Sequence, residues 1–166
     1  ESILWAVALA LAIRTFIVAP FKIPSGSMRP TLIEGDRILV SKFVYKLRGP
    51  ERGEIIVFRF PENPKKPFIK RLIGEGEDRV QIRDGRILIN ALPSTTPVIE
   101  RNYYYNAGTF GEAGQIITVP TGQYYVLGDN SASSHDSRFW GFVPRRLVIG
   151  KAVCIFWPPH RIRLLQ

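Results

Sequence analysis

The stretch RVQIRDGRILIN, residues 79–90, is the clearest indication of the fold of this chain. Apolar and polar residues alternate on both sides of Asp84-Gly85, and such a pair is a strong signal for a β-hairpin with a two-residue turn. No long amphipathic helix follows the N-terminal region. Other short runs rich in Ile, Val, Phe and Tyr, bounded by Gly, Pro and Asn, lie at residues 37–45, 55–60, 68–73, 115–119, 123–127 and 148–157. The sequence therefore predicts a mainly β protein with an antiparallel β-sheet core, either a folded sheet or a barrel.

Residues 91–114 interrupt this strand pattern. They are rich in Pro, Gly and Asn, which indicates an excursion from the core. We therefore expect residues 20–78 and 123–166 to form the β core, with residues 79–122 inserted as a small β extension.

The N-terminal residues differ from the rest. Residues 3–13 are uninterrupted apolar sequence, the apolar character resumes at residues 16–19, and Pro20 is expected to end any helix. A helix of about 17 residues at about 1.5 Å per residue reaches roughly 25 Å, slightly less than a hydrocarbon core of about 30 Å. We therefore expect residues 1–19 to form an N-terminal transmembrane anchor helix, truncated at its start, with Arg14 extending toward a lipid headgroup. A cleaved secretory signal and a buried amphipathic helix fit the pattern less well.

The composition argues against several classes of protein. The 166 residues are 45% hydrophobic, which is enough to bury a core and too apolar for a disordered tail. One Cys and two His argue against a disulfide framework, a Cys-based zinc site and a His-rich metal centre, so we expect no metal and no cofactor. The net charge of +9 is dispersed along the chain, which favours a surface beside acidic phospholipids over nucleic-acid binding.

A hydroxyl-rich loop carries the first candidate chemistry. Residues 25–27 read Ser-Gly-Ser, and a serine becomes a nucleophile when a base takes its proton and nearby donors stabilise the oxyanion. His135, oriented by Asp129 or Asp136, would complete a conventional Ser-His-Asp set.

A lysine is the alternative base. Lys42 and Lys70 each lie in an apolar strand run, where strand alternation puts them on the same face as apolar residues. Burial among apolar groups lowers the pKa of a lysine by up to about 3–5 units, which makes the neutral amine available. The alternation does not choose between the two lysines.

Four segments of the chain occur in the order found in a known enzyme family. They follow the apolar N-terminal region and comprise residues 25–32, 35–42, 70–78 and 128–141. In this series the chain resembles type I signal peptidase, a bacterial or organellar membrane-anchored serine protease with a Ser-Lys dyad that removes signal peptides.

The resemblance implies a role for each residue that matches the family pattern. Ser27 matches the nucleophile, and Lys70 matches the general base. Ser25 matches the hydroxyl that forms the oxyanion hole together with the backbone amide of Ser27. Ser134 matches the serine that hydrogen-bonds to the lysine amine and orients it.

Further matches concern the support of the site and its substrate. Asp136 and Arg138 match a pair that holds the site together. Ile23 and Met28 fall where the family lines shallow pockets for small residues, such as Ala at the first and third positions before the cut.

Two places depart from the family pattern. Residues 75–77 read Glu-Gly-Glu where the family usually has Pro-Gly before the Asp, and Ser131 stands where the family usually has Arg. We expect the two added carboxylates to raise the pKa of Lys70 if they approach it, and we expect one structural contact to be lost at Ser131.

The resemblance also implies the function. The chain would be a membrane-anchored serine endopeptidase that cleaves signal peptides from exported preproteins after Ala-x-Ala-type residues. Its partners would be preprotein signal peptides and the lipid bilayer, with no nucleic acid, and a monomer is favoured. It would cross the plasma membrane, or a thylakoid or other organellar inner membrane, once, with the catalytic domain on the extracytoplasmic or lumenal side. A membrane-tethered Ser-His hydrolase that uses His135, a self-cleaving Ser-Lys protease and a non-enzymatic membrane-anchored β binding module are the alternatives.

Overall fold

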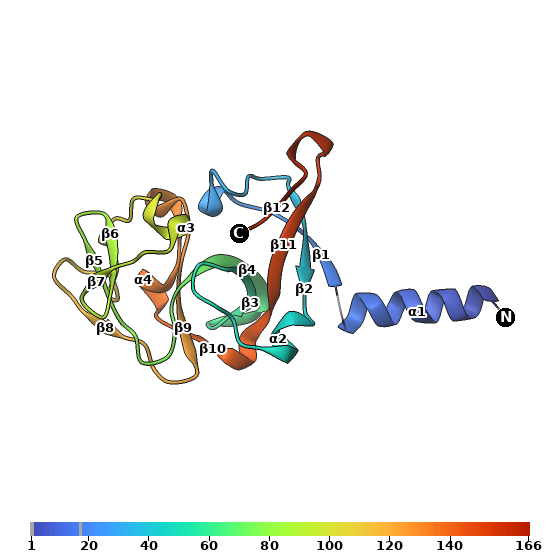
Figure 1. Ribbon diagram of the computed structural model, residues 1–166, viewed down its shortest axis with the longest axis horizontal. Coiled ribbons are helices and arrows are strands. Elements are labelled where there is room, and N and C mark those ends of the chain that lie inside the picture. The colour runs from blue at the N-terminus through green and yellow to red at the C-terminus, as the bar shows by residue number, and fades with distance from the viewer. Residues whose placement is uncertain (1, 17) are drawn as a thin grey trace.

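The computed structural model describes residues 2–16 and 18–166 (Figure 1). The strands are β1 (Val18–Lys22), β2 (Arg37–Ser41), β3 (Ile55–Phe60), β4 (Asn63–Gly74), β5 (Arg79–Arg83), β6 (Arg86–Ile89), β7 (Leu92–Pro93), β8 (Ile117–Thr118), β9 (Gln123–Leu127), β10 (Val143–Pro144), β11 (Val148–Trp157) and β12 (Arg163–Leu164). The α-helices are α1 (Ser2–Phe16), α2 (Val44–Leu47), α3 (Pro97–Glu100) and α4 (Ser137–Trp140), and the 3-10 helices are η1 (Gly26–Met28), η2 (Ser131–Ser133), η3 (Arg145–Leu147) and η4 (Pro159–Arg161). The predicted mainly β fold with an antiparallel core is confirmed.

The strands pair in a larger and a smaller antiparallel sheet. The larger sheet has the order β1-β2-β11-β3-β4-β9-β10, with β12 paired to β11. The smaller sheet has the order β7-β6-β5-β8, and its strands fall within the segment for which the sequence predicts an inserted extension. Figure 1 shows the smaller sheet at the end of the molecule opposite α1.

The predicted hairpin is formed by β5 and β6. Arg83 pairs with Arg86 across the turn, and Asp84 and Gly85 have φ angles of 52° and 76°. Positive φ at both central residues is what a type I′ turn requires, and its twist matches that of the flanking strands. The local sequence therefore determines this part of the smaller sheet.

Clusters of buried apolar side chains hold the sheets together. One cluster joins the two sheets and includes Ile73 and Leu127 from the larger sheet and Val80 from the smaller. Successive residues of β3 point to opposite faces of the larger sheet, so that Val57 packs with η1, β2 and β11, while Phe58 packs with β4 and β9. The first of these faces supports the turn that carries the candidate nucleophile.

The N-terminal helix is shorter than predicted. It ends at Phe16 rather than Ala19, and Val18–Lys22 form β1, which pairs with β2. Pro20 lies inside β1, opposite Leu39, instead of ending a helix. Because β1 is an edge strand of its sheet, the missing N–H of Pro20 is tolerated there. Pairing with β2 and burial of Ala19 hold this segment to the sheet and override the apolar helical pattern.

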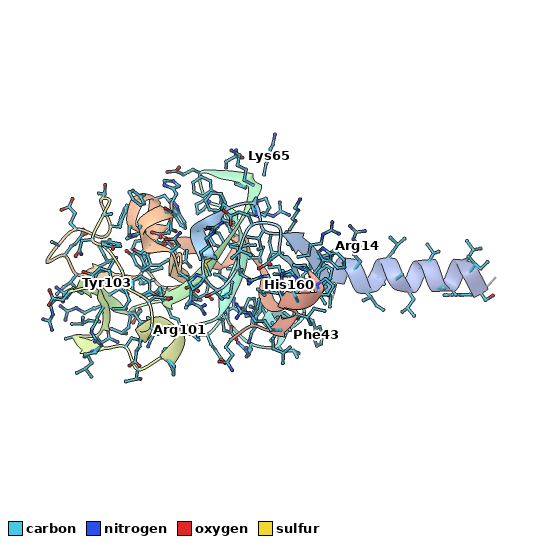
Figure 2. The ribbon with its side chains drawn as sticks, turned by 90° about the horizontal axis from the view of Figure 1, so that it is seen from above. Arg14, Phe43, Lys65, Arg101, Tyr103 and His160 are labelled. Carbon is cyan, nitrogen blue, oxygen red and sulfur yellow. The ribbon has the colours of Figure 1, made fainter. Side chains whose placement is uncertain are left out.

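Helix α1 projects from the β body with its apolar side chains exposed (Figures 1 and 2). Ile3, Leu4 and Trp5 are 77%, 75% and 77% exposed. α1 has 15 residues, and within residues 2–16 and 18–166 we find no helix with the length and apolar character needed to cross a bilayer. The predicted transmembrane helix is therefore not confirmed.

Some strand boundaries also differ from the prediction. The run at residues 37–45 divides into β2 and the short helix α2, whose first residue, Val44, donates its N–H to the Ser41 hydroxyl at 3.4 Å. β4 begins at Asn63, ahead of the predicted run at residues 68–73. In the run at residues 115–119, only β8 is strand.

Candidate active site

Ser27 lies in the 3-10 turn η1 and is buried. Asn130, which follows β9, holds this turn: its backbone N–H donates to the Ser27 carbonyl at 2.9 Å, and its side-chain amide donates to the Gly26 carbonyl at 3.0 Å. Met28 and Leu32 pack in the apolar cluster with β2 and β11. Polar contacts from one segment and apolar contacts from another thus fix the backbone that carries the Ser27 hydroxyl.

Lys70 reaches Ser27 from β4, the strand between β3 and β9. Lys70 is buried, with 5% of its surface exposed. Its Nζ lies 2.9 Å from Ser27 Oγ and 3.1 Å from the Ile69 carbonyl oxygen. The centre of the Phe68 ring lies 5.4 Å from the same Nζ. Strand alternation left Lys42 and Lys70 as equal candidates, and the structure brings Lys70 into contact with Ser27.

Burial lowers the pKa of Lys70 to about 8. The carboxylates of Asp136 and Asp129 act in the opposite direction, but their combined effect is smaller than that of burial. At a pKa near 8 about one amine in ten is neutral at pH 7, against about one in 2,500 for an ordinary lysine. A lysine able to accept a proton is therefore present at neutral pH.

Each of these aspartates is paired with a buried arginine. Asp129 accepts hydrogen bonds from Arg71 Nε at 2.7 Å and Nη2 at 2.6 Å. Asp136 accepts from Arg138 Nε at 2.8 Å and Nη2 at 2.9 Å, and from the Gly128 N–H at 3.1 Å. The predicted supporting residues Asp136 and Arg138 thus form an ion pair beside the site. Both arginines compensate carboxylates that would otherwise hold Lys70 in its charged form.

The two other predicted serines differ in their surroundings. Ser25 is exposed, with its Oγ 3.5 Å from Ser27 Oγ. Ser134 is buried, and its Oγ has no hydrogen-bond partner among the described residues. The expected hydrogen bond between Ser134 and the lysine amine is therefore not formed in this structure; the contacts of the amine are with Ser27 Oγ and the Ile69 carbonyl oxygen. The orienting role of Ser134 stays a prediction.

A pocket of about 410 Å³ opens beside Ser27 and Lys70. Ile23 and Met28, the predicted pocket residues, both line it and are both buried, and Phe68 lines it from β4. Apolar walls around a few polar groups are typical of a ligand-binding pocket.

His135 also lines this pocket, but its contacts are with aromatic rings. It is exposed, and its ring stacks on Phe139 with the centroids 5.4 Å apart and meets the edge of Phe60 at 6.1 Å. The side chain within hydrogen-bond distance of Ser27 Oγ that can act as a base is Lys70. The geometry therefore favours Lys70 over His135.

The carboxylates of the atypical segment 75–77 have other partners. Glu75 accepts from the Arg52 backbone N–H at 2.9 Å, and Glu77 accepts from the Thr121 hydroxyl at 2.8 Å. The charges that raise the pKa of Lys70 are those of the two aspartates already described. The conditional expectation that these glutamates act on Lys70 is therefore not supported by their positions.

Ser131, the second atypical residue, makes several contacts. Its hydroxyl accepts from Arg138 Nη1 at 2.8 Å and from the Tyr105 N–H at 2.9 Å, and its carbonyl accepts from Arg138 Nη2 at 2.8 Å. Ser131 therefore helps to hold the arginine of the supporting pair. Whether a contact of the family's Arg is lost at this position stays a prediction.

The pattern-based reasoning missed Arg71 and Thr31. Arg71 is fully buried, and Thr31 Oγ1 donates to Asp129 at 2.6 Å. Arg71 stays protonated and cannot act as a base, so a search for a base does not select it. Its position in an apolar strand was nevertheless a usable signal, because a buried guanidinium requires a buried acid as its partner.

Comparison with known proteins gives the family. The signal peptidase family, peptidase S26, matches residues 1–157 of the chain. The chain is 42% identical to probable signal peptidase I-2 of Synechocystis sp., over 99% of this chain and 75% of that protein. It is 44% identical to signal peptidase I of Leptolyngbya laminosa, over 95% of this chain and 77% of that protein. It is 33% identical to thylakoidal processing peptidase 1 of Arabidopsis thaliana, over 95% of this chain and 47% of that protein.

The matched region contains all four segments that carry the resemblance seen in the sequence, including the turn of Ser27 and the strand of Lys70. The resemblance is therefore confirmed. The chain belongs to the peptidase S26 family and is an enzyme of the signal peptidase I type.

Proposed function

We propose that this chain is a membrane-anchored serine endopeptidase that cleaves signal peptides from exported preproteins, with Ser27 as the nucleophile and neutral Lys70 as the general base. The observation that carries the proposal is the 2.9 Å separation of Lys70 Nζ and Ser27 Oγ in a buried, largely apolar setting. Such a setting gives a lysine the neutral form that a base requires.

The reaction divides into acylation and deacylation. Neutral Lys70 accepts the Ser27 proton while Oγ attacks the scissile carbonyl, and the resulting ammonium protonates the leaving amine. The amine, again neutral, then activates the water that releases the acyl-enzyme. The Ser27 N–H and the Ser25 hydroxyl stabilise the oxyanion, and one such donor contributes about 10²–10³-fold in rate.

The substrate follows from the pocket. Ile23 and Met28 wall a recess next to the nucleophile and leave a mostly apolar surface. A small residue such as Ala fits beside these side chains, and this supports cleavage after Ala-x-Ala-type sequences.

Helix α1 supplies the membrane attachment in this proposal. An apolar helix whose side chains are exposed all round is favoured in lipid over water, and Arg14 lies in its last turn, where its charge reaches a headgroup. The catalytic body then lies on the extracytoplasmic or lumenal side, close to the bilayer that holds the substrate.

Cleavage of a fluorogenic Ala-x-Ala peptide by the purified chain in detergent tests the proposed function. We expect the wild type, Lys42→Ala and His135→Ala to cleave it, and Ser27→Ala and Lys70→Ala to be inactive. Loss of activity in His135→Ala with activity retained in Lys70→Ala would favour a Ser-His hydrolase. An inactive wild type that no serine-directed acylating reagent labels at Ser27 would favour a binding module.

The pH dependence of the reaction follows from the pKa of Lys70. Because the base is the neutral amine, we expect kcat/KM to rise about tenfold per pH unit up to a midpoint near pH 8 and to level off above it. Initial rates between about pH 5.5 and 9.5 measure this. A midpoint near 6.5, the ordinary pKa of histidine, would point to His135 instead.

Gly128 has a steric role in the site. A Cβ at this position would lie 2.2 Å from Ser134 Oγ and 2.5 Å from the Ser27 carbonyl oxygen. We expect Gly128→Ala to displace the Ser27 turn and to lower kcat/KM about a hundredfold, since a displacement of about 1 Å at the reacting atoms has an effect of that size. Gly49→Ala is the control, because its Cβ would meet only Arg145 Nη1 at 3.4 Å. Equal activities of the two variants would show that the turn does not need the space at Gly128.

A further inference from the structure

A buried bridge joins the loop of Ser27 to the strand of Lys70. Thr31 lies on the same loop as Ser27, and its Oγ1 donates to Asp129 Oδ2 at 2.6 Å. Arg71 directly follows Lys70 in β4, and its guanidinium donates to the same carboxylate at 2.6 and 2.7 Å. The elements that carry the nucleophile and the base are therefore connected through Asp129, independently of the contact between Ser27 and Lys70.

The members of this bridge are shielded from water. Thr31, Arg71 and Asp129 are 8%, 0% and 6% exposed. Hydrogen bonds to a charged group are stronger than neutral ones, and low local polarity strengthens them further. The bridge therefore couples the position of the Ser27 loop to the position of β4.

The segment around β12 packs over the bridge. The Gln166 carbonyl accepts from Arg71 Nη1 at 3.0 Å, and Arg163 Nη2 donates to the Thr31 carbonyl. Leu165 is buried in the same apolar cluster as Met28. Thr31 is thus held at its hydroxyl by Asp129 and at its carbonyl by Arg163.

We propose that Thr31 is a positioning residue for the reaction: through Asp129 it sets the placement of Ser27 relative to Lys70, and Arg163 keeps Thr31 in position. This proposal rests on the proposed function of Ser27 and Lys70. Thr31 does not contact the reacting atoms, so its effect is on their geometry and on the charge next to them.

The bridge also has an electrostatic consequence at the Lys70 amine. The Thr31 hydroxyl neutralises part of the Asp129 charge, and Asp129 raises the pKa of Lys70. Without that hydroxyl the carboxylate acts more strongly on the amine, and the pKa of Lys70 rises. The substitution leaves the other charged or titratable groups unchanged. They are Asp136, which also acts on the amine, Arg71 and Arg138, which pair with the two aspartates, and His135, which lines the same pocket.

The test compares Thr31→Val, which removes the hydroxyl at nearly constant volume, with Thr31→Ser, which keeps it. The matched control is Thr121→Val, because Thr121 also donates to a carboxylate, that of Glu77 at 2.8 Å, but on the exposed surface. We expect kcat of Thr31→Val to fall about tenfold with KM within about twofold of the wild type, because positioning acts on the transition state. We also expect its pH midpoint to move upward.

Thr31→Ser and Thr121→Val should retain the wild-type kcat and pH midpoint. A Thr31→Val protein with the wild-type kcat and midpoint would overturn the proposal, and so would an equal loss in Thr31→Ser.

If Thr31→Val does not fold, as judged by circular dichroism, Arg163→Met and Arg163→Lys make the same comparison at the contact that holds the Thr31 carbonyl. A lower kcat at unchanged KM in Arg163→Met, with recovery in Arg163→Lys, supports the proposal, and wild-type kcat in Arg163→Met contradicts it. Failure of the proposed function is recognised separately, since it requires an inactive wild type or an active Lys70→Ala protein.

Discussion

Lys70→Met is expected to abolish peptide cleavage and, at the same time, to stabilise the protein at neutral pH. Loss of the general base lowers the rate by about 10²–10⁴-fold. The stability gain has a different origin. Burial lowers the pKa of Lys70 from 10.5 to about 8 in the folded chain, so the unfolded chain binds this proton more tightly.

The sign of the pH dependence follows from this difference. Below about pH 8 folding has to bury the charge, and the penalty is fully present; it shrinks as the pH rises from about 8 to 10.5 and is absent above that range. At 1.36 kcal/mol per unit the penalty at pH 7 is about 3 kcal/mol, from which the lost hydrogen bond to Ser27 removes about 1 kcal/mol. Met has a similar length without the charge. We therefore expect a net gain of about 2 kcal/mol at pH 7.

Urea unfolding of the wild type and Lys70→Met at pH 7 and near pH 11 measures this effect. The control is Lys65→Met, because Lys65 is exposed and extends from the β body (Figure 2). Lys65→Met should leave the stability unchanged at both pH values. A Lys70→Met protein that is less stable than the wild type at pH 7 would show that the amine is not held in an unfavourable environment.

Asp129→Asn is expected to destabilise the fold by about 3–5 kcal/mol. Asp129 and Arg71 are paired at 2.6 Å with both side chains at 0% exposure. An amide keeps the shape of the carboxylate but leaves the guanidinium charge of Arg71 buried without compensation, since the remaining acceptors, the amide oxygen and the carbonyls of Gly53 and Gln166, are all neutral.

Glu34→Gln is the control for this second prediction, because it breaks the exposed Arg29–Glu34 pair at 2.7 Å, where solvent screens the charges and we expect little change in stability. The double replacement Arg71→Met with Asp129→Leu should recover most of the loss, since it removes both buried charges. Equal denaturation midpoints for Asp129→Asn and the wild type would contradict the prediction.

The features that were predictable from the sequence are those that local pattern determines. Asp84-Gly85 fixes the β5–β6 turn through its own backbone preferences, and the runs at 55–60, 123–127 and 148–157 become β3, β9 and β11 with the predicted bounds. The helix predicted for residues 1–19 ends earlier in the structure, because pairing of β1 with β2 outweighs the helical preference of the apolar residues before Pro20.

Features that depend on contacts distant in sequence could not be derived from pattern alone. Strand alternation made Lys42 and Lys70 equal candidates for the general base, and the family resemblance selected Lys70. Which lysine reaches Ser27 depends on where β4 lies relative to η1. Arg71 and Asp129 are 58 residues apart, and no local pattern pairs them. The surroundings of Ser134 likewise depend on how the segment after β9 packs against the Ser27 turn, which sequence spacing does not specify.

The titration of the Lys70 side chain in the wild-type protein, followed by NMR of the atoms next to its amine, tests the central claim most directly. We predict a single midpoint near pH 8, which disappears in Lys70→Met. A Lys70 signal that titrates above about pH 10, as an ordinary lysine does, would contradict the claim that Ser27 is activated by a neutral amine.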